Sequence, residues 1–323
     1  MRTRSAQRGF TLVELMISLV LFAFVVAGIL AVAVSMTGGF REQRDATNAE
    51  GLVRVPIDYI ADAIRQASPG VPGFNIQDAN SCSTSALTVT NNASSAPFVS
   101  GTDVLDVIYA SGGVMTQTKT AFTSGTTIDL VDVTGFANGD YVVISNLGSG
   151  HFFHITGVNT GTNQLTVETL CGSYALPATG YNAGSFAIRA VHSKFYIGLL
   201  DGANALWMDP DSSGVAFTGD KAAEPLAEGV EDMQIAVGID TAADGLTPGE
   251  WVSTNTVWPP AAGTGTIRAV RLTLIARSAN IDTGNSLFGG RPAAEDHTAG
   301  AADKYRRRIL KTTIEFRNVG VSP

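Results

Sequence analysis

The sequence predicts an α+β fold in which a long N-terminal helix, transmembrane in its first part, packs on a mostly antiparallel β domain. Three observations support this fold class. An apolar run from Leu15 through Val34 carries no charged residue. Apolar residues then recur at helical spacing up to Ala67, and from Cys82 onward short β-branched segments alternate with Gly, Asn and Asp. We expect a helix over 10–67, with its transmembrane part at 10–36, and a β-rich domain over 68–323.

The apolar run is long enough to cross a bilayer, because a helix needs ~20 apolar residues to span the hydrocarbon core. The segment before it holds Arg2, Arg4 and Arg8 and no acid. The positive-inside rule therefore places the N-terminus in the cytoplasm and the bulk of the chain across the inner membrane, in the periplasm. The run exceeds the ~7–15 residues of a secretory h-region and ends without a small-x-small cleavage site, so we expect it to be retained.

Glu14 places a carboxylate near the start of this helix, where insertion costs ~2.5–3.5 kcal/mol and an acid usually has a partner. Gly-Phe-Thr-Leu-Val-Glu-Leu-Met-Ile-Ser at Gly9–Ser18, behind a basic leader at 1–9, resembles the class III leader of type IV pilins and type II secretion pseudopilins. The resemblance implies that a prepilin peptidase cuts between Gly9 and Phe10, that Phe10 is then methylated, and that Glu14 meets a neighbour's charged N-terminus. The simpler alternative is a plain membrane anchor with a stray glutamate.

The helical pattern continues from Phe40 to Ala67. Its apolar stripe recurs at spacings of three and four and comprises Val53, Ile57, Ile60, Ala61 and Ile64. Pro56 lies inside the pattern and is expected to kink the helix, since it removes one backbone hydrogen bond. Ser68-Pro69-Gly70 is expected to end it. This half of the helix therefore has a face that can pack on a globular domain.

The remaining chain predicts short strands separated by turn residues. The candidate strands are Leu87–Thr90, Val104–Tyr109, Thr127–Val131, Tyr141–Ser145, Phe152–Val158, Leu165–Glu168, Phe186–Tyr196, Met233–Ile239, Ile267–Ala276 and Ile309–Arg317. Regularly spaced strands between Thr126 and Leu170 predict a compact β subdomain at 126–170, inserted between the helix and the C-terminal sheet.

Composition limits the classes of function. Charged residues make up only 15% of the 323 residues and the formal net charge is −8, so a general nucleic-acid binder, which needs a basic surface, is not expected. The two cysteines, Cys82 and Cys171, both lie in the part expected outside the cytoplasm. In an oxidising periplasm they predict one disulfide, and the alternative is two unlinked core residues.

No stretch points to catalysis or to a cofactor. The sequence has no G-x-S-x-G, P-loop or G-x-G-x-x-G motif, so we expect no enzyme. His151 and His154 would point to opposite faces of a strand, which argues against a shared metal. The turn from Asp240 to Asp244 and Gly245 distantly resembles a calcium loop, but a solvated turn is the simpler interpretation. The run Arg306-Arg307-Arg308 is interpreted as three solvated side chains at the edge of a strand, where their charge discourages pairing with a strand of another molecule. The alternative is that they bind an anionic partner.

Several further stretches resemble the PilW-type large minor pilins, which are related to the GspJ pseudopilins. They include Thr102–Leu105, Gly139–Val142, Phe153–Val158, Leu226–Gln234, Val270–Arg277 and Tyr305–Arg308. The resemblance implies a pilin-like fold and a minor pilin that takes part in priming and assembly of a pilus, in the inner membrane and then in the pilus. Its implied partners are other minor and major pilins and the prepilin peptidase. The alternatives are a minor pseudopilin of a type II secretion system and a pilus-tip adhesin.

Overall fold

The computed structural model describes residues 11–71, 76–78, 86–168, 176–177, 179–211, 221–253, 265–278, 281 and 287–316. The chain divides into two compact units, Met1–Asn48 and Ala49–Pro323. Helix α1 (Leu12–Arg65) begins in the first unit and ends in the second. The helix is continuous through Gly38-Gly39, although glycine is a poor helix former.

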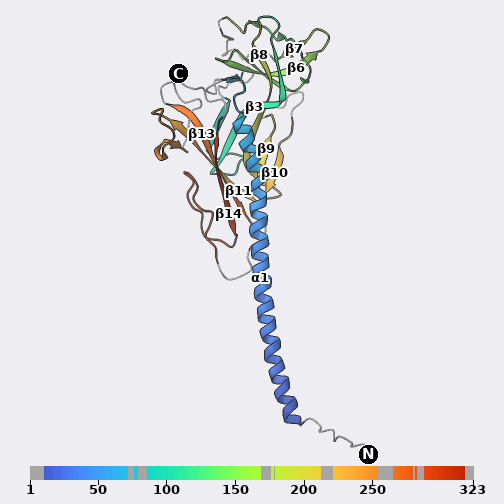
Figure 1. The fold of residues 1–323 in the computed structure, drawn as a ribbon, viewed down its shortest axis with the longest axis vertical. Coiled ribbons are helices and arrows are strands. Elements are labelled where there is room, and N and C mark those ends of the chain that lie inside the picture. Colours follow the sequence, from blue (N-terminus) through green and yellow to red (C-terminus); the bar gives the residue numbers. More distant parts are fainter. Residues whose placement is uncertain are drawn as a thin grey trace, which may run out of the picture. The chain divides into compact units, whose positions relative to one another are not determined.

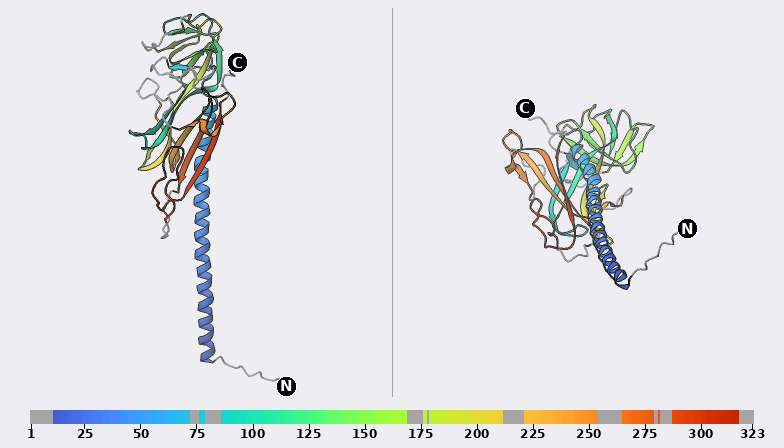
Figure 2. Two further views of the ribbon diagram at one scale, coloured as in Figure 1. Left: turned by 90° about the vertical axis from the view of Figure 1, so that its left-hand side faces the viewer. Right: turned by 60° about the horizontal axis from the view of Figure 1, so that its bottom comes forward.

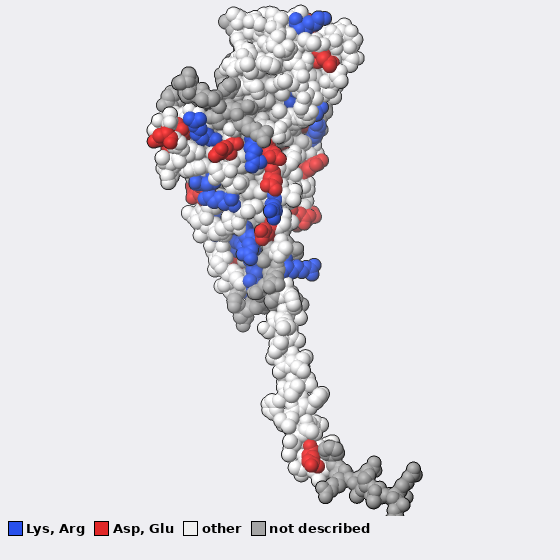
Figure 3. Space-filling model, viewed as in Figure 1, with Lys and Arg blue, Asp and Glu red and all other residues white. Residues whose placement is uncertain are grey.

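In the first unit, α1 presents the apolar segment Leu12–Thr37, which has 26 residues and a mean hydropathy of 2.9. At 1.5 Å per residue it is ~39 Å long, which exceeds the ~30 Å hydrocarbon core of a bilayer. Nearly all its side chains are exposed. Figure 3 shows this surface as uncharged except for acidic atoms near its start. By length and composition the segment can cross a membrane.

In the second unit, the last turns of α1 bury one face. The buried residues include every member of the predicted stripe, Val53, Ile57, Ile60, Ala61 and Ile64. Arg54, Asp58 and Asp62 are exposed on the other side. The helix runs through Pro56 and ends at Arg65. The amide of Ser68 then donates to the carbonyl of Ile108 at 3.0 Å, which joins the helix exit to the β domain.

Within the described residues, the strands of the second unit form a ten-stranded and a four-stranded sheet. The larger sheet contains β1 (Ile76–Asp78), β2 (Leu87–Ala93), β3 (Thr102–Gln117), β4 (Thr127–Asp129), β5 (Tyr141–Ser145), β6 (Gly150–Asn159), β7 (Gln164–Val167), β8 (Phe186–Leu200), β9 (Ala203–Asp209) and β10 (Glu224–Glu228). The smaller sheet contains β11 (Val230–Asp240), β12 (Trp251–Val252), β13 (Thr266–Arg277) and β14 (Arg307–Glu315).

The strand order in the larger sheet is β10-β9-β8-β5-β6-β7-β4, and β3 joins β2 to β8. The smaller sheet has the order β12-β11-β13-β14. All described strand pairs are antiparallel except for β1 with β6. Figures 1 and 2 show the green strands β6 and β7 at one end of this unit and the orange-to-red sheet at another. The predicted α+β class, with a mostly antiparallel β domain, is confirmed.

Each predicted strand has a counterpart, although Arg317, the predicted end of the last one, lies outside the described residues. Four short strands were not predicted: β1, β9, β10 and β12. The strand β10 contains Pro225, which has no N–H to donate, and it is tolerated because β10 is the last strand of its row.

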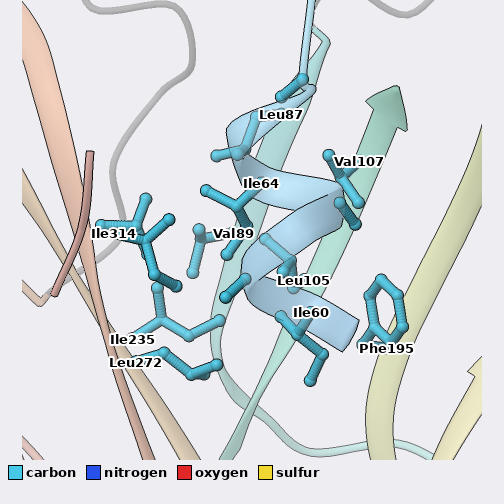
Figure 4. Packing of buried hydrophobic residues seen from close by; sticks show 14 of the residues in the cluster. Ile60, Ile64, Leu87, Val89, Leu105, Val107, Phe195, Ile235, Leu272 and Ile314 are labelled. Carbon is cyan, nitrogen blue, oxygen red and sulfur yellow. The ribbon is translucent and has the colours of Figure 1, made fainter. Parts of the chain in front are cut away.

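The main core joins α1 to both sheets. Figure 4 shows Ile60 and Ile64 of α1 among Leu87, Val89, Leu105, Val107 and Phe195 of the larger sheet and Ile235, Leu272 and Ile314 of the smaller one. All of these side chains are at most 8% exposed. At ~1.5–3 kcal/mol for each fully buried large apolar side chain, this cluster is a principal source of stability for the unit.

A second cluster lies around β4–β7. It contains buried side chains such as Ile128, Phe153, Leu165 and Tyr181. Its strands are nevertheless continuous with the larger sheet, because β5 pairs with β8 from Tyr141↔Ala190 to Ser145↔Phe186. The cluster also includes Phe122, Tyr181 and Ala187, which lie outside the expected subdomain, so a separate subdomain at 126–170 stays a prediction.

Candidate functional site

Among the candidate functional residues, those at the start of α1 have the most clearly defined geometry. Thr11 precedes the helix and Glu14 lies in its first turn. The Glu14 Oε2 atom accepts hydrogen bonds from the Thr11 amide at 3.0 Å and from Thr11 Oγ1 at 2.9 Å. In return, the Glu14 amide donates to Thr11 Oγ1 at 3.2 Å. This reciprocal pair is a capping box, which satisfies backbone donors that a helix start leaves free.

Thr11 was not singled out from the sequence as a partner of Glu14, although the spacing Thr-x-x-Glu before an apolar run is the signal for a capping box. Within the described residues, Glu14 Oε1 accepts no hydrogen bond, whereas Oε2 is shared with Thr11. Glu14 therefore keeps one oxygen available for a cation. Gly9 and Phe10, the expected cleavage and methylation residues, lie outside the described residues.

Cys82 and Cys171 also lie outside the described residues, so their pairing stays a prediction. The two histidines of β6 are both buried and have separate partners. His151 Nδ1 lies 2.6 Å from the Tyr181 hydroxyl, and His154 Nδ1 lies 2.8 Å from Glu168 Oε1. Each imidazole therefore has its own hydrogen-bond partner, and the absence of a shared metal stays a prediction.

The interpretation of the arginine run as solvated is wrong for Arg307. Its side chain is only 8% exposed and is hydrogen-bonded to the carboxylates of Glu231 and Asp303. The Arg307 hydrogen bond lowers the pKa of Asp303. Arg308 is exposed, as expected for a strand edge. The sequence could not reveal this difference because Glu231 lies on β11, 76 positions away.

A buried carboxyl, Asp103 on β3, is another residue that sequence reasoning missed. Its Oδ1 accepts from the Asn92 amide at 3.0 Å and its Oδ2 from the Ile235 amide at 2.7 Å, which ties the two sheets together. Burial raises the pKa of Asp103 to about 7, and the carboxylates of Asp296 and Asp232 add to the rise. The two amide donors act in the opposite direction without cancelling the effect of burial.

The acidic turn at Asp240 to Gly245 has a third carboxylate nearby that the sequence did not indicate. Asp240 ends β11 and Asp244 lies in the connection that follows. The fold brings Glu250, the last residue of a 3-10 turn at Pro248–Glu250, close to both of them. Glu250 was missed because it lies outside the spacing of an EF-hand loop, in which the closing glutamate is at position 12.

The chain matches known proteins in two stretches. A family model described as the prokaryotic N-terminal methylation motif matches residues 4–30, and one described as type IV pilus-assembly protein W, PilW, matches residues 194–318. Among solved structures, a type IV-like pilin from Thermus thermophilus is similar at 14% identity, covering 57% of this chain and 85% of that one with a TM-score of 0.25. No curated protein matches the chain. The two matched stretches contain Glu14 and strands β9–β14.

Proposed function

Since the chain is a type IV pilin-like protein of the PilW type, we propose that it is a minor pilin that helps to prime assembly of the pilus as a low-abundance subunit near the tip. The observation that carries the proposal is the occurrence of both matches on one chain. The methylation motif accounts for processing and membrane anchoring, and the PilW match covers the strands that would distinguish this subunit from others.

The proposed mechanism starts in the membrane. The apolar segment Leu12–Thr37 holds the subunit in the inner membrane before assembly, with the β domain in the periplasm. Cleavage between Gly9 and Phe10 would leave a cationic amine on Phe10. That amine and the Glu14 carboxylate are both costly to bury alone, so neighbouring subunits would supply each other's missing charge.

The geometry at Glu14 supports this pairing. Its Oε2 atom is held by Thr11 of the same chain, which fixes the carboxylate at the start of the helix. Cleavage after Gly9 leaves the Thr11 amide intact, so the capping box would survive processing. Oε1 would then meet the amine of the next subunit and set the axial register of the helices in the filament.

The β domain would provide contacts with other pilins rather than a reaction centre. The PilW match includes all four strands of the smaller sheet, β11–β14, and this side of the molecule carries many charged side chains (Figure 3). A polar, charged surface is typical of subunit contacts that set specificity and register. Major and minor pilins are the expected partners, and the prepilin peptidase is the expected processing enzyme.

Deletion of the gene tests the proposal against its closest alternative. We expect the deletion strain to lose most surface pili, to keep normal secretion of folded exoproteins, and to recover pili when the wild-type gene is supplied. Normal piliation combined with failed exoprotein secretion would instead identify a pseudopilin of a type II secretion system. Normal piliation with loss of surface attachment alone would favour a tip adhesin.

A further inference from the structure

The connection between β13 and β14 contains a segment, residues 287–303, that doubles back on itself and is called the strap below. The amide of Phe288 donates to the carbonyl of Asp303 at 2.7 Å, and the amide of Asp303 donates back at 3.2 Å. In the middle of the strap, Ala294 and His297 exchange amide hydrogen bonds of 3.0 and 2.8 Å. Among the described residues, the backbone–backbone hydrogen bonds of the strap all lie within it, so it can move as one body.

The strap takes no part in the apolar cores. None of its residues belongs to a hydrophobic cluster in the described part of the chain. The aromatic ring of Phe288 instead packs against the guanidinium of Arg306, 4.3 Å from the ring centroid. Burial of apolar surface is the dominant favourable contribution to folding, so the strap lacks the kind of contact that holds the second part of α1 in place.

Charged side chains attach the strap to the smaller sheet. Glu295 of the strap accepts from Arg271 Nε of β13 at 2.9 Å and lies 3.1 Å from Lys311 Nζ of β14. Arg291 of the strap donates to the carboxylate of Asp232 on β11. Three strands of the smaller sheet are thus joined to the strap by ion pairs.

Polar contacts extend the attachment to the larger sheet. Asp296 Oδ2 accepts from the side-chain amides of Asn91 and Asn92 of β2 at 2.8 and 3.0 Å. The next residue, His297, has its Nδ1 atom 3.1 Å from Gln234 Nε2 of β11. The strap therefore crosses from one sheet to the other and is held to both by charged and polar side chains.

These contacts cover Thr273 in the middle of β13. Leu272 and Leu274 belong to the main core, and Figure 4 shows Leu272 there. Thr273 must point to the opposite, outer face of the smaller sheet, because side chains alternate along a strand. It is nevertheless only 2% exposed. Its cross-strand neighbours are Gln234 and Lys311, both of which contact the strap, so the strap covers this face.

We propose that the strap is a charge-held cover that opens as a unit while both sheets stay folded, and that it thereby controls access to the outer face of the smaller sheet. The Coulomb energy of a partly buried ion pair is largely offset by the cost of removing its charges from water. Opening returns the Arg271 and Lys311 side chains, already 23% and 52% exposed, to water. The strap therefore opens at a lower free energy than the sheets, which are held by apolar clusters.

The test compares two cysteine reporters in the full-length protein, purified in detergent micelles. Thr273→Cys places a thiol beneath the strap, whereas Ser193→Cys is a nearly isosteric change at a fully buried position of β8 and reports unfolding of the larger sheet. Both variants are treated with iodoacetamide. Peptide mass spectrometry measures labelling at the substituted position separately from Cys82 and Cys171. Each rate is divided by the rate for the same variant unfolded in urea, which corrects for the reactivity of the thiol.

We expect the Thr273→Cys thiol to react at least about tenfold faster than the Ser193→Cys thiol, and far more slowly than in the unfolded chain. Low concentrations of urea should accelerate mainly the Ser193→Cys reaction, since opening the strap exposes little surface and unfolding a sheet exposes much. Equal rates with equal urea dependence would overturn the proposal. A Thr273→Cys thiol that reacts as fast as in the unfolded chain would also overturn it, because the strap would then not cover this face.

A charge variant tests what holds the strap closed. Glu295→Gln leaves Arg271 and Lys311 without their carboxylate and should speed Thr273→Cys labelling at least about tenfold. Glu315→Gln, at an exposed position of β14, is the matched control and should change the rate by less than about twofold. Hydrogen exchange of the wild-type chain repeats the comparison without a new thiol, and strap amides should depend less on urea than those of β13. An equal effect of the two glutamine variants, or equal urea dependence of the two segments, would contradict the proposal.

Discussion

Under the proposed function, Glu14 has two roles, one in capping its own helix and one in assembly. Its Oε2 atom caps its own helix through Thr11, and its Oε1 atom is free of partners within the described part of the chain. On insertion scales a charged side chain costs ~2.5–3.5 kcal/mol at the centre of a membrane helix, and the cost is smaller near the start of the helix, where Glu14 lies. A counter-charge from another subunit would offset that cost.

Replacing Glu14 by Gln is predicted to reduce incorporation into pili while leaving the membrane-bound pool unchanged. Gln can still accept from Thr11, but it cannot form an ion pair with an N-terminal amine. Quantitative blots of sheared pili and membranes provide the measurement. Ser18→Ala is the control in the same helix, because it removes only a local hydrogen bond to Leu15. Equal incorporation of Glu14→Gln and wild type would mean that this carboxylate does not set assembly.

Asp103 is the residue through which pH should act on stability. Its pKa is about 7 in the folded protein against 3.8 unfolded, so folding favours the protonated form. Stability contributed by the neutral carboxyl is complete below pH ~4, is lost as pH rises from ~4 to ~7, and changes no further above that range. Carboxyls with lowered pKa values, such as Asp303 and Glu295, act with the opposite sign at more acidic pH.

Asp103→Asn is therefore predicted to flatten the loss of stability between pH 4 and pH 7. The rise in the Asp103 pKa from 3.8 to about 7 corresponds to roughly 4 kcal/mol of stability, at 1.36 kcal/mol per pKa unit. Denaturant unfolding of the full-length protein in micelles, repeated across this pH range, measures the effect. Burial also raises the pKa of Asp209, to about 6, so Asp209 contributes to the pH dependence of stability in the same range. Comparing the variant with the wild type cancels this contribution, because both contain Asp209. Identical pH profiles would show that Asp103 does not titrate in this range.

At the scale of elements, the second part of α1 is held by apolar packing against both sheets. Ile64 is fully buried in the main cluster. Ile64→Ala is predicted to destabilise the protein by ~2–5 kcal/mol, since the removed side chain leaves a cavity. Val55→Ala, on the same helix but 75% exposed, should change the free energy of unfolding by no more than ~0.5 kcal/mol.

Denaturant unfolding of the full-length protein measures both helix variants. If the Ile64→Ala and Val55→Ala variants lost equal stability, the helix would not dock through the stripe that Ile64 belongs to.

The strand β14 offers a second matched pair. Arg307→Ala removes the partner of the buried Glu231 carboxylate, and breaking such a pair costs ~3–5 kcal/mol because one charge is left buried alone. Arg308→Ala, at the next position, removes an exposed guanidinium and should cost less than ~0.5 kcal/mol. Thermal and denaturant unfolding of the two variants compare them directly. Similar losses would contradict the assignment of Arg307 to a buried ion pair.

The elements that the sequence predicted well are those with a strong local pattern. The stripe from Val53 to Ile64 has helical spacing, and β13 is rich in β-branched and apolar residues. Both elements could therefore be predicted from their own segments of the sequence. The segments β9 and β10 are strands because β9 pairs with β8 and β10 pairs with β9. Such pairing is a property of the tertiary structure, and a short segment such as Glu224–Glu228 carries little local signal for it.

At the scale of the whole molecule, the candidate functional residues and their contacts differ in how far they could be predicted. Glu14 was identified because its motif is contiguous. The partnership of Arg307 with Glu231 and the approach of Glu250 to Asp240 depend on how β11 is placed by the fold. Residues separated by a strand connection or by most of a domain leave no spacing in the sequence that would predict their contact.

Mass spectrometry of sheared pili can show whether this chain is processed and built into a pilus as a minor pilin. We expect a low-abundance subunit whose N-terminal peptide begins at methylated Phe10. A chain that is absent from pili, or one present there that still begins at Met1 in a strain with active prepilin peptidase, would contradict it.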